Sequence, residues 1–406
     1  MRTAIAGPLA DTIAGANAEA VLRACVHCGM CNATCPTFQL TGDELDGPRG
    51  RIYLMKQVVE GVPAGRTTQL HLDRCLTCRA CETTCPSGVE YHRLLDVARP
   101  LVDQQVARPW REALARRLIR LVAPYPGRFR LVQSLGRLAR PLLPASLRGK
   151  LTPRTANGPA PAGLPDHARR MVLLEGCVQA ASAPHFNAAA RRVFARMGIR
   201  LEETPGAGCC GAVSFHLDAI EEAKAFARRN IDAWTAQLDG GAQAVVVGAS
   251  GCAAFIATYG DLLAEDPAYA ARAARIAALV RDPVQVLEAS PPEAKRAPSQ
   301  PRIAVHEPCT LQHGLRLTAR IARLLASLGY EPQPVRDNHL CCGSAGSYAL
   351  LQPAMAGALR ADKLAALTES APAAIYTANI GCWMHLGEDS PIPVRHWIEA
   401  VDDVTE

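Results

Sequence analysis

Sixteen cysteines are the residues of this chain with the most definite chemistry, eight before residue 90 and eight after residue 175. The first eight form two runs of identical spacing, Cys-x-x-Cys-x-x-Cys-x-x-x-Cys-Pro, at 25–36 and 75–86. Bacterial two-cluster ferredoxins use this spacing to hold two [4Fe–4S] clusters. Zinc sites also use Cys-x-x-Cys pairs, but a third cysteine and a following Cys-Pro in each run have no role in them. The runs therefore predict iron–sulfur clusters.

The ferredoxin rule also predicts which thiolates share a cluster. Three closely spaced cysteines of one run bind one cluster, and the fourth ligand comes from the end of the other run. Cluster 1 is then held by Cys25, Cys28, Cys31 and Cys85, and cluster 2 by Cys75, Cys78, Cys81 and Cys35. Interleaved ligands place two clusters close together, which suits electron transfer. No G-x-G-x-x-G, P-loop or G-x-S-x-G motif accompanies them, so we assign no catalytic residue.

The other eight cysteines predict a duplicated unit. From the single cysteine to the Cys-Cys pair the step is 32 in both copies (209 − 177 and 341 − 309), and from the pair to the last cysteine it is 42 and 40. Such self-similarity indicates an internal repeat. Four thiols per repeat suffice for one more metal cluster, so three interpretations stay open: a cluster in each repeat, in one repeat, or in neither. The candidate ligands are Cys177, Cys209, Cys210 and Cys252 in the first copy and Cys309, Cys341, Cys342 and Cys382 in the second.

The elements around these cysteines predict the fold class. Apolar strands are expected at 171–174, 244–247, 302–305 and 373–376, alternating with helices such as 188–197 and 315–328. Another short strand is expected in each repeat between that helix and the Cys-Cys-Gly turn. This alternation is typical of a parallel sheet covered on both faces, with ligands bound at the carboxyl ends of the strands. We therefore expect α/β architecture: an α-helical two-[4Fe–4S] ferredoxin-like domain (1–100), a basic amphipathic helical linker (101–168), and a duplicated Rossmann-like α/β cysteine-rich CCG domain (169–289 and 300–398).

Two charged segments admit more than one interpretation. In 43–61, acidic residues precede Arg49 and Arg51; we favour a plain helix start over a contact that tunes a cluster or docks a partner. In 108–150, ten Arg and Lys150 face one acid, Glu112, which is a net +10 against +6 for the whole chain. These charges interleave with leucines at helical spacing, so the segment either contacts an anionic membrane or packs on the rest of the protein.

Composition narrows the class of protein. With 406 residues, 49% hydrophobic and 20% charged, the chain is globular, with two or three domains. No nucleic-acid motif accompanies its basic residues, so no nucleic-acid partner is expected. The N-terminus lacks a signal-peptide pattern and the cysteines match a reducing compartment, which predicts a cytoplasmic protein.

Three segments carry a family resemblance: CVHCGMCNATCPTF, DELDGPRGRIYLMK and HLDRCLTCRACETTCPSGVEY. With the two CCG repeats and HEPCTLQHG, they resemble the iron–sulfur subunits of bacterial glycolate oxidase (glycolate dehydrogenase). Those belong to a wider group of electron-transfer subunits with ferredoxin-type and heterodisulfide-reductase-like CCG domains. One departure is that neither Cys252 nor Cys382 is followed by the second cysteine that heterodisulfide reductases use.

The resemblance implies an electron-transfer subunit. Partner subunits would carry FAD and oxidise glycolate to glyoxylate, and this chain would pass the electrons to a quinone-type acceptor at the inner face of the cell membrane. An alternative is a heterodisulfide-reductase-like thiol/disulfide reductase, or the iron–sulfur subunit of another 2-hydroxyacid or glycerol-3-phosphate dehydrogenase. A third is an iron–sulfur assembly or sensor protein without enzymatic activity.

Overall fold

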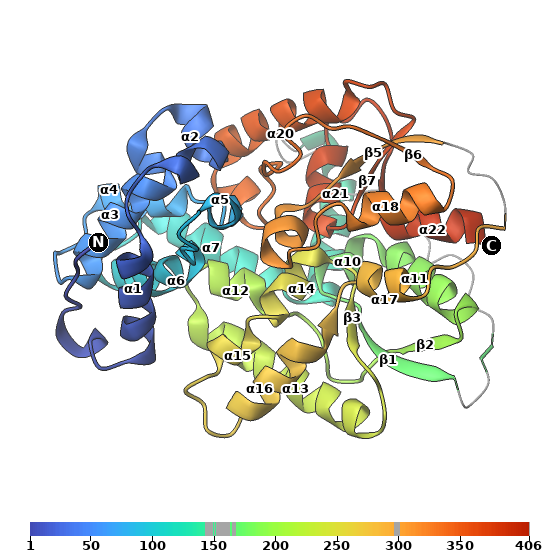
Figure 1. The fold of residues 1–406 in the computed structure, drawn as a ribbon, viewed down its shortest axis with the longest axis horizontal. Helices are drawn as coiled ribbons and strands as arrows, with labels where there is room; N and C mark the ends of the chain where they lie inside the picture. Colours follow the sequence, from blue (N-terminus) through green and yellow to red (C-terminus); the bar gives the residue numbers. More distant parts are fainter. Residues whose placement is uncertain (143–148, 150, 152–162, 165–167, 296–300, 406) are drawn as a thin grey trace. The chain divides into compact units, whose positions relative to one another are not determined.

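The computed structural model describes residues 1–142, 149, 151, 163–164, 168–295 and 301–405 (Figure 1). They form two compact units. The first unit comprises Met1–Arg116 and Asp337–Lys363, and the second comprises Arg117–Arg336 and Leu364–Glu406. Much of the predicted linker after residue 142, including Lys150, lies outside the described residues, as do residues 296–300 between the predicted repeats.

The regular elements described between residues 1 and 116 are all helical. They enclose a core of apolar side chains that includes Leu22, Met55, Leu72 and Leu94, each almost fully buried. The cysteine runs lie at the ends of these helices, so the core positions them. The elements are η1 (Gly7–Leu9), α1 (Ile13–Ala24), η2 (Met30–Thr34), α2 (Pro36–Thr41), η3 (Glu44–Asp46), α3 (Pro48–Val59), α4 (Arg66–Asp73), α5 (Ala80–Thr84) and α6 (Tyr91–Gln105), and later in the chain α19 (Tyr348–Leu351) and the start of α20 (Pro353–Thr368).

The described part of the basic segment is helical, as predicted. It forms α7 (Trp110–Val122), which runs from the first unit into the second, then α8 (Pro126–Leu138) and η4 (Arg140–Leu142). At least three of its arginines are used internally: Arg108 Nη1 and Arg116 Nη2 donate to Asp73 at 2.6 and 2.9 Å within the first unit, and Arg120 Nη1 donates to Glu222 Oε2 at 3.2 Å within the second. Among the described residues, no helix combines the length and the apolar character needed to cross a bilayer.

Two parallel sheets organise the second unit, which confirms the predicted mixed α/β class. The strand order is β2-β1-β3-β4 in one sheet and β6-β5-β7-β8 in the other, and every pairing is parallel. Each described sheet has one strand more than expected, because β4 and β8 are too short to give an apolar run. The strands are β1 (Arg169–Leu174), β2 (Ile199–Glu202), β3 (Val245–Val247), β4 (Val280–Arg281), β5 (Arg302–His306), β6 (Glu331–Gln333), β7 (Ala374–Thr377) and β8 (Val394–His396).

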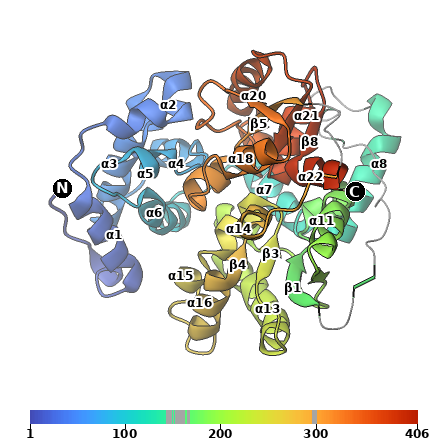
Figure 2. The ribbon, with the colours of Figure 1, turned by 45° about the vertical axis from the view of Figure 1, so that its right-hand side comes forward.

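Helices cover both faces of the first sheet (Figure 2). Met171 and Leu173 of β1 pack with α11, while Val172 and Leu174 on the opposite face pack with Trp234 of α13. This explains why the strand is apolar throughout. The helices of the second unit are α10 (Val178–Ser182), α11 (Pro184–Arg196), α12 (Ala212–His216), α13 (Ile220–Asp239), α14 (Ser250–Ile256), α15 (Tyr259–Leu262), α16 (Ala270–Leu279), α17 (Pro283–Ala289), the π-helical turn η5 (Thr310–Gly314), α18 (Arg320–Ser327), α21 (Ile380–Gly387) and α22 (Trp397–Thr405).

One predicted helix starts later than expected. The pattern favoured 315–328, but α18 begins at Arg320. Arg316 and Ala319 have φ angles of 56° and 61°, which a helix does not allow. The apolar spacing at 315–319 therefore belongs to a turn that packs on the core.

The carboxyl ends of β3 and β7 meet within the second unit. Ser250 N donates to the carbonyl oxygen of Ala378 at 3.0 Å, and Asn379 Nδ2 donates to Ser250 Oγ at 3.2 Å. Ser250 Oγ also lies 2.8 Å from Thr310 Oγ1. Because Cys252 and Cys382 sit in the helices that begin here, the two repeats present these cysteines from neighbouring strand ends.

Candidate metal centres

The two ferredoxin-type runs fold into loops with matching backbone conformations. In the first loop His27 and Gly29 have positive φ angles of 61° and 86°, and in the second Thr77 and Arg79 have 53° and 63°. These residues occupy equivalent positions between successive cysteines. Left-handed backbone at a non-glycine residue costs on the order of 1–3 kcal/mol and persists where the surroundings impose it. Two copies of the same costly conformation indicate that both loops are shaped to gather their thiols.

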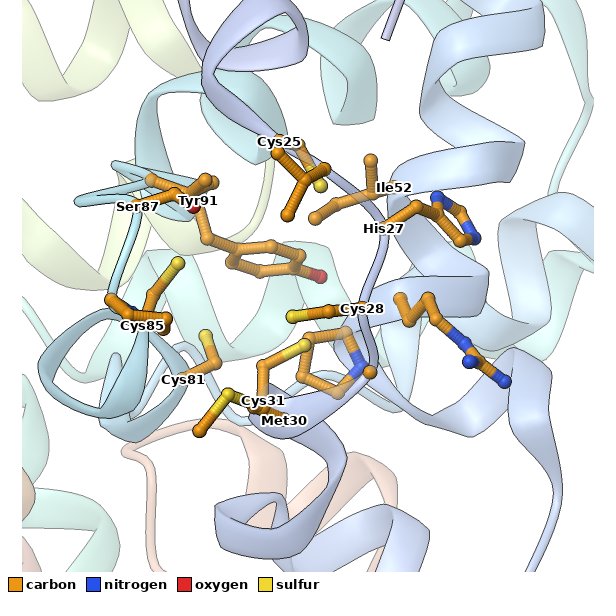
Figure 3. Close-up of a pocket in the computed structure, with 16 residues that line it drawn as sticks. Cys25, His27, Cys28, Met30, Cys31, Ile52, Cys81, Cys85, Ser87 and Tyr91 are labelled. Atoms are coloured by element: carbon orange, nitrogen blue, oxygen red, sulfur yellow. The ribbon is translucent and has the colours of Figure 1, made fainter.

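The first loop lines a pocket together with the end of the second run (Figure 3). The side chain of Tyr91, from the start of α6, also lines it. Figure 3 shows that the cysteines come from two separate segments, the first loop and the end of the second run at α5. The cysteines lining this pocket are the four predicted for cluster 1, with Cys81 in addition: Cys25, Cys28, Cys31, Cys81 and Cys85.

A second pocket in the same unit gathers the other predicted set. It is lined by Cys35, Cys75, Cys78 and Cys81, with Tyr91 again in the wall. Tyr91 Oη lies 3.8 Å from Cys75 Sγ. Each group of four cysteines predicted from the spacing thus lines one pocket, and Cys81 borders both. The assignment of ligands to clusters stays a prediction.

Burial controls the protonation of these thiols. It raises the pKa of Cys31 to about 11 and raises those of Cys25 and Cys81, the last most strongly. Convergent thiols become good ligands once a cation replaces their protons. The donor set is all sulfur, which suits iron–sulfur clusters or zinc and excludes magnesium or calcium.

A buried arginine adjoins the second pocket. Arg51, on α3, is 1% exposed, and its Nη1 lies 3.1 Å from Thr37 Oγ1 and 3.9 Å from Cys35 Sγ. Its Nε donates to the carbonyl oxygen of His71 at 2.7 Å. The favoured interpretation of this segment was right about the helix start but wrong about Arg51, which touches a candidate ligand. Sequence spacing gave no sign of which arginine would turn inward.

Arg49 behaves differently, although it lies two residues away on the same helix. Its Nε donates to Glu44 Oε1 at 2.6 Å, and its side chain is 36% exposed. It borders the first pocket and approaches Gly29, where a Cβ atom would lie 2.9 Å from Arg49 Nη1. The first pocket therefore has an exposed, paired arginine at its edge.

All four cysteines of the first repeat lie in the second unit and converge. Contacts between thiols lead from Cys177 to Cys209, from Cys209 to Cys210 and from Cys210 to Cys252. The Cys209 contact and burial both raise the pKa of Cys177 well above its ordinary value. Cys177 follows β1 and Cys252 follows β3, the two strands between which the chain order reverses. Open α/β sheets bind ligands at that position.

The Cys209–Cys210 turn is held by residues that sequence reasoning missed. Asn230 Nδ2 donates to the carbonyl oxygen of Cys209 at 2.9 Å, and Tyr259 Oη donates to that of Cys210 at 2.6 Å. Both side chains are fully buried. Gly211, with φ of 95°, follows the pair and packs directly on α13. An asparagine on the apolar face of an amphipathic helix was the available signal for this support.

The four cysteines of the second repeat are divided between the two units. Cys341 and Cys342 belong to the first unit, and Cys309 and Cys382 to the second. The turn itself is repeated: Gly343 has φ of 87°, and a Cβ atom there would lie 2.7 Å from the carbonyl oxygen of Ala356. A shared ligand set in this repeat stays a prediction.

The segment carrying Cys341 lies near the second pocket within the first unit. Burial raises the pKa of Tyr348; nearby, Arg51 opposes this shift while Cys75 and Cys341 add to it. Tyr348 therefore sits among charges from both the ferredoxin-type run and the second repeat. The first unit therefore contains cysteines of the ferredoxin-type runs and of the second repeat, with Tyr348 near both.

Comparisons with known proteins agree with this arrangement. A family model described as a 4Fe-4S dicluster domain matches residues 21–89, and one described as a cysteine-rich domain matches 171–257 and 303–387. The glycolate oxidase iron-sulfur subunit of Escherichia coli (strain K12) is 48% identical over 406 residues, the full length of both chains. The probable glycolate oxidase iron-sulfur subunit of Bacillus subtilis (strain 168) is 30% identical, covering 91% of this chain and 89% of its own. Lactate utilization protein A of Bacillus licheniformis is 26% identical, covering 51% and 88%.

Proposed function

Because this chain belongs to the family of glycolate oxidase iron–sulfur subunits, we propose that it carries electrons released by glycolate oxidation. The electrons would come from FAD on partner subunits, where glycolate becomes glyoxylate, and would leave to a quinone-type acceptor. The observation that carries this proposal is the convergence of two four-cysteine sets on two pockets of one helical unit.

Each pocket would hold one [4Fe–4S] cluster, which supplies one-electron redox chemistry when bound. Cys25, Cys28, Cys31 and Cys85 would hold the first, and Cys35, Cys75, Cys78 and Cys81 the second. Cys81 borders both pockets, so the two clusters would be close neighbours. The chain's own residues set the environment: Tyr91 adjoins both pockets, and Arg51 adjoins the second.

We further propose that the first cysteine-rich repeat holds a third cluster. Its four thiols contact one another in succession, and they lie where the strand order of a parallel sheet reverses. Because its parallel strands also reverse their order between β1 and β3, we propose that the repeat is Rossmann-like. The second repeat would bind a fourth cluster if Cys309, Cys341, Cys342 and Cys382 meet.

Iron content and activity together test the electron-transfer role. The anaerobically prepared chain should contain about twelve iron atoms if one repeat is loaded, about sixteen if both are, and about eight if neither is. Cys252→Ser should remove about four of these atoms and leave the ferredoxin-type clusters. In the complex with flavin subunits, Cys28→Ser should abolish glycolate-dependent quinone reduction, while the matched loop variant Val26→Ala, at a 69% exposed side chain, should not. Full activity of Cys28→Ser, or a chain that holds only zinc, would overturn the proposal.

The same preparation distinguishes the alternative activity. A thiol/disulfide reductase would reduce a disulfide substrate with the isolated chain, without flavin subunits. The electron-transfer subunit should show no such reduction and should gain glycolate-dependent activity only in the complex.

We also propose that α8 rests on an anionic membrane surface at the cytoplasmic face, close to the lipid-soluble acceptor. Leu131, Val132, Leu135 and Leu138 lie on one face of the helix, and all are exposed, Leu138 at 83%. Arginines flank this face, and α8 has no acidic residue. Apolar side chains bordered by arginine complement a bilayer interface with anionic headgroups.

Sedimentation with vesicles tests the α8 contact. The complete chain should sediment with phosphatidylglycerol vesicles and much less with phosphatidylcholine vesicles. Leu131→Ser with Leu135→Ser should release it, whereas Leu350→Ser, at an exposed leucine in the other unit, should not. Equal sedimentation of all three proteins would exclude this surface, and retention by the flavin subunits instead would assign it to a protein partner. Arg116, which is buried against Asp73, is unsuitable for this test.

A further inference from the structure

The two ferredoxin-type pockets differ most in the charge buried beside them. Around the second pocket, Arg51 and Arg74 both contact Asp46: Arg51 Nη2 lies 3.5 Å and Arg74 Nη1 2.9 Å from its carboxylate oxygens. Asp46 is fully buried and also lies 2.8 Å from His71 Nδ1. Two arginines thus meet one carboxylate in this buried network. At the first pocket Arg49 is paired with Glu44 at an exposed edge, and the N-terminal ammonium of Met1 donates to the carbonyl oxygen of Cys25 at 2.8 Å.

Arg51 is a fully buried cation beside the candidate ligands of the second pocket. It is 1% exposed, lines that pocket, and approaches Cys35 Sγ at 3.9 Å. Its Nη2 faces Asp46 Oδ1 at 3.5 Å but makes no hydrogen bond of standard geometry. A buried guanidinium with incomplete hydrogen bonding beside a cavity of thiols is further stabilised when a negatively charged group is bound there. The residues therefore fit an anionic cluster–thiolate assembly better than an empty pocket.

Arg51 stays a cation in this setting, because arginine is not deprotonated in proteins even when it is buried. A permanent cation in a buried site acts through a low effective dielectric, so its effect on a neighbouring electron is larger than that of an exposed charge. Net charge near the cluster and hydrogen bonds to its sulfurs are main determinants of iron–sulfur reduction potential.

We propose that Arg51 is a positioning residue that makes the cluster at Cys35, Cys75, Cys78 and Cys81 the more easily reduced of the two. This inference rests on the proposed function, because it requires both clusters to be bound. On reduction the cluster accepts one electron and its charge becomes more negative by one, and Arg51 favours that state. An electron shared by the two clusters would then reside mainly on the second, next to Tyr348 and the turn of the second repeat.

Redox titration of the complete chain, followed by EPR spectroscopy, tests this proposal. Arg51→Gln should lower the reduction equilibrium constant of one cluster at least tenfold, equal to 59 mV for a one-electron couple, and change the other less than threefold. Arg49→Gln, which removes the same charge from the exposed side of the same helix, should shift neither cluster more than threefold. The EPR signal that disappears in Cys78→Ser identifies the second cluster.

A substitution that should shift the reduction equilibrium in the opposite direction separates a charge effect from structural damage. Asp46→Asn removes the negative charge from the same network and should raise the equilibrium constant of the second cluster. Damage to the fold would not shift the two variants in opposite directions. If Arg51→Gln fails to load iron, Arg51→Lys, which keeps the charge, should restore loading, and Asp46→Asn then decides the proposal.

The outcomes distinguish this inference from the proposed function. Absence of two four-iron signals in the unmodified chain would overturn the proposed function itself. Two signals whose potentials are unchanged in Arg51→Gln and Asp46→Asn, or shifted equally by Arg49→Gln, would overturn the role of Arg51 alone.

Discussion

Replacing Gly211 by alanine should damage the first cysteine-rich site through two effects that the structure separates. Gly211 has φ of 95°, a conformation that costs an L-residue about 1–2 kcal/mol. An added Cβ atom would also lie 2.9 Å from the carbonyl oxygen of Ala223 and 3.3 Å from Cβ of Phe226. Overpacking of this kind costs typically 1–3 kcal/mol. We therefore expect Gly211→Ala to destabilise the second unit by about 2–5 kcal/mol.

Gly241→Ala provides the matched control. Gly241 has φ of 98°, nearly the same backbone conformation, but an added Cβ atom there would have no neighbour within 4 Å. Only the backbone cost applies, so this variant should lose about 1–2 kcal/mol. In a domain of this size each kcal/mol corresponds to roughly 2–4 °C in melting temperature.

Thermal unfolding and iron analysis of both variants form the assay. Gly211→Ala should melt below Gly241→Ala, and it alone should lose about four iron atoms, because relief of the clash moves Cys210 away from Cys252. Equal melting temperatures with equal iron content would refute the argument that close packing of the Cys-Cys-Gly turn on α13 positions the thiols.

Three further changes test the electrostatics of the second unit by denaturant unfolding. Burial raises the pKa of Asp282 to about 7, above its unfolded value, so this carboxyl contributes up to about 4 kcal/mol at pH 4 that is lost as the pH rises to 8; the free energy of unfolding of the wild type minus that of Asp282→Asn should fall by this amount, and a constant difference counts against the raised pKa. Burial lowers the pKa of His396 to about 4, so its contribution of about 3 kcal/mol is present above pH 6.5 and lost toward pH 4; the wild type minus His396→Gln difference should fall accordingly, and a constant difference contradicts the assignment. Asp402→Asn removes the charge that binds Arg192 and should lower the free energy of unfolding by about 2–4 kcal/mol. Asp403→Asn, at a more exposed carboxylate, should lower it by less than about 1 kcal/mol. Similar losses in the two variants would argue against a buried ion pair at Asp402.

The sequence predicted those features that repeat or that depend on local spacing. Two runs of Cys-x-x-Cys-x-x-Cys were enough to indicate which thiols share a pocket, since a short loop has few ways to gather three thiols. The duplication of the cysteine-rich repeat and its parallel strands followed from equal spacings and apolar runs. Strands β4 and β8, one in each sheet, were not predicted, because a strand of two or three residues has no periodic hydrophobic pattern.

Tertiary choices were not predictable from one sequence. Arg49 and Arg51 are two residues apart on α3, and helical geometry alone sends them about 200° apart around the axis. Which of them turned inward depended on where α4 lies, because the carbonyl oxygen of His71 is what Arg51 bonds. In the same way, Asn230 and Tyr259 come together at the Cys209–Cys210 turn only after α13 and α15 have packed.

The two ferredoxin-type loops show how local and tertiary constraints divide the choice of residue. Both loops require a left-handed residue after the second cysteine, and one uses Gly29 while the other uses Arg79. At Gly29 an added Cβ atom would meet only the end of the Arg49 side chain, so the positive φ angle is what favours glycine there. Arg79 bears the same backbone cost, but its Nε donates to Glu82 at 2.9 Å, and that carboxylate also binds the start of α6 at His92. Loop geometry therefore fixes the backbone, and the neighbouring helix decides which side chain occupies it.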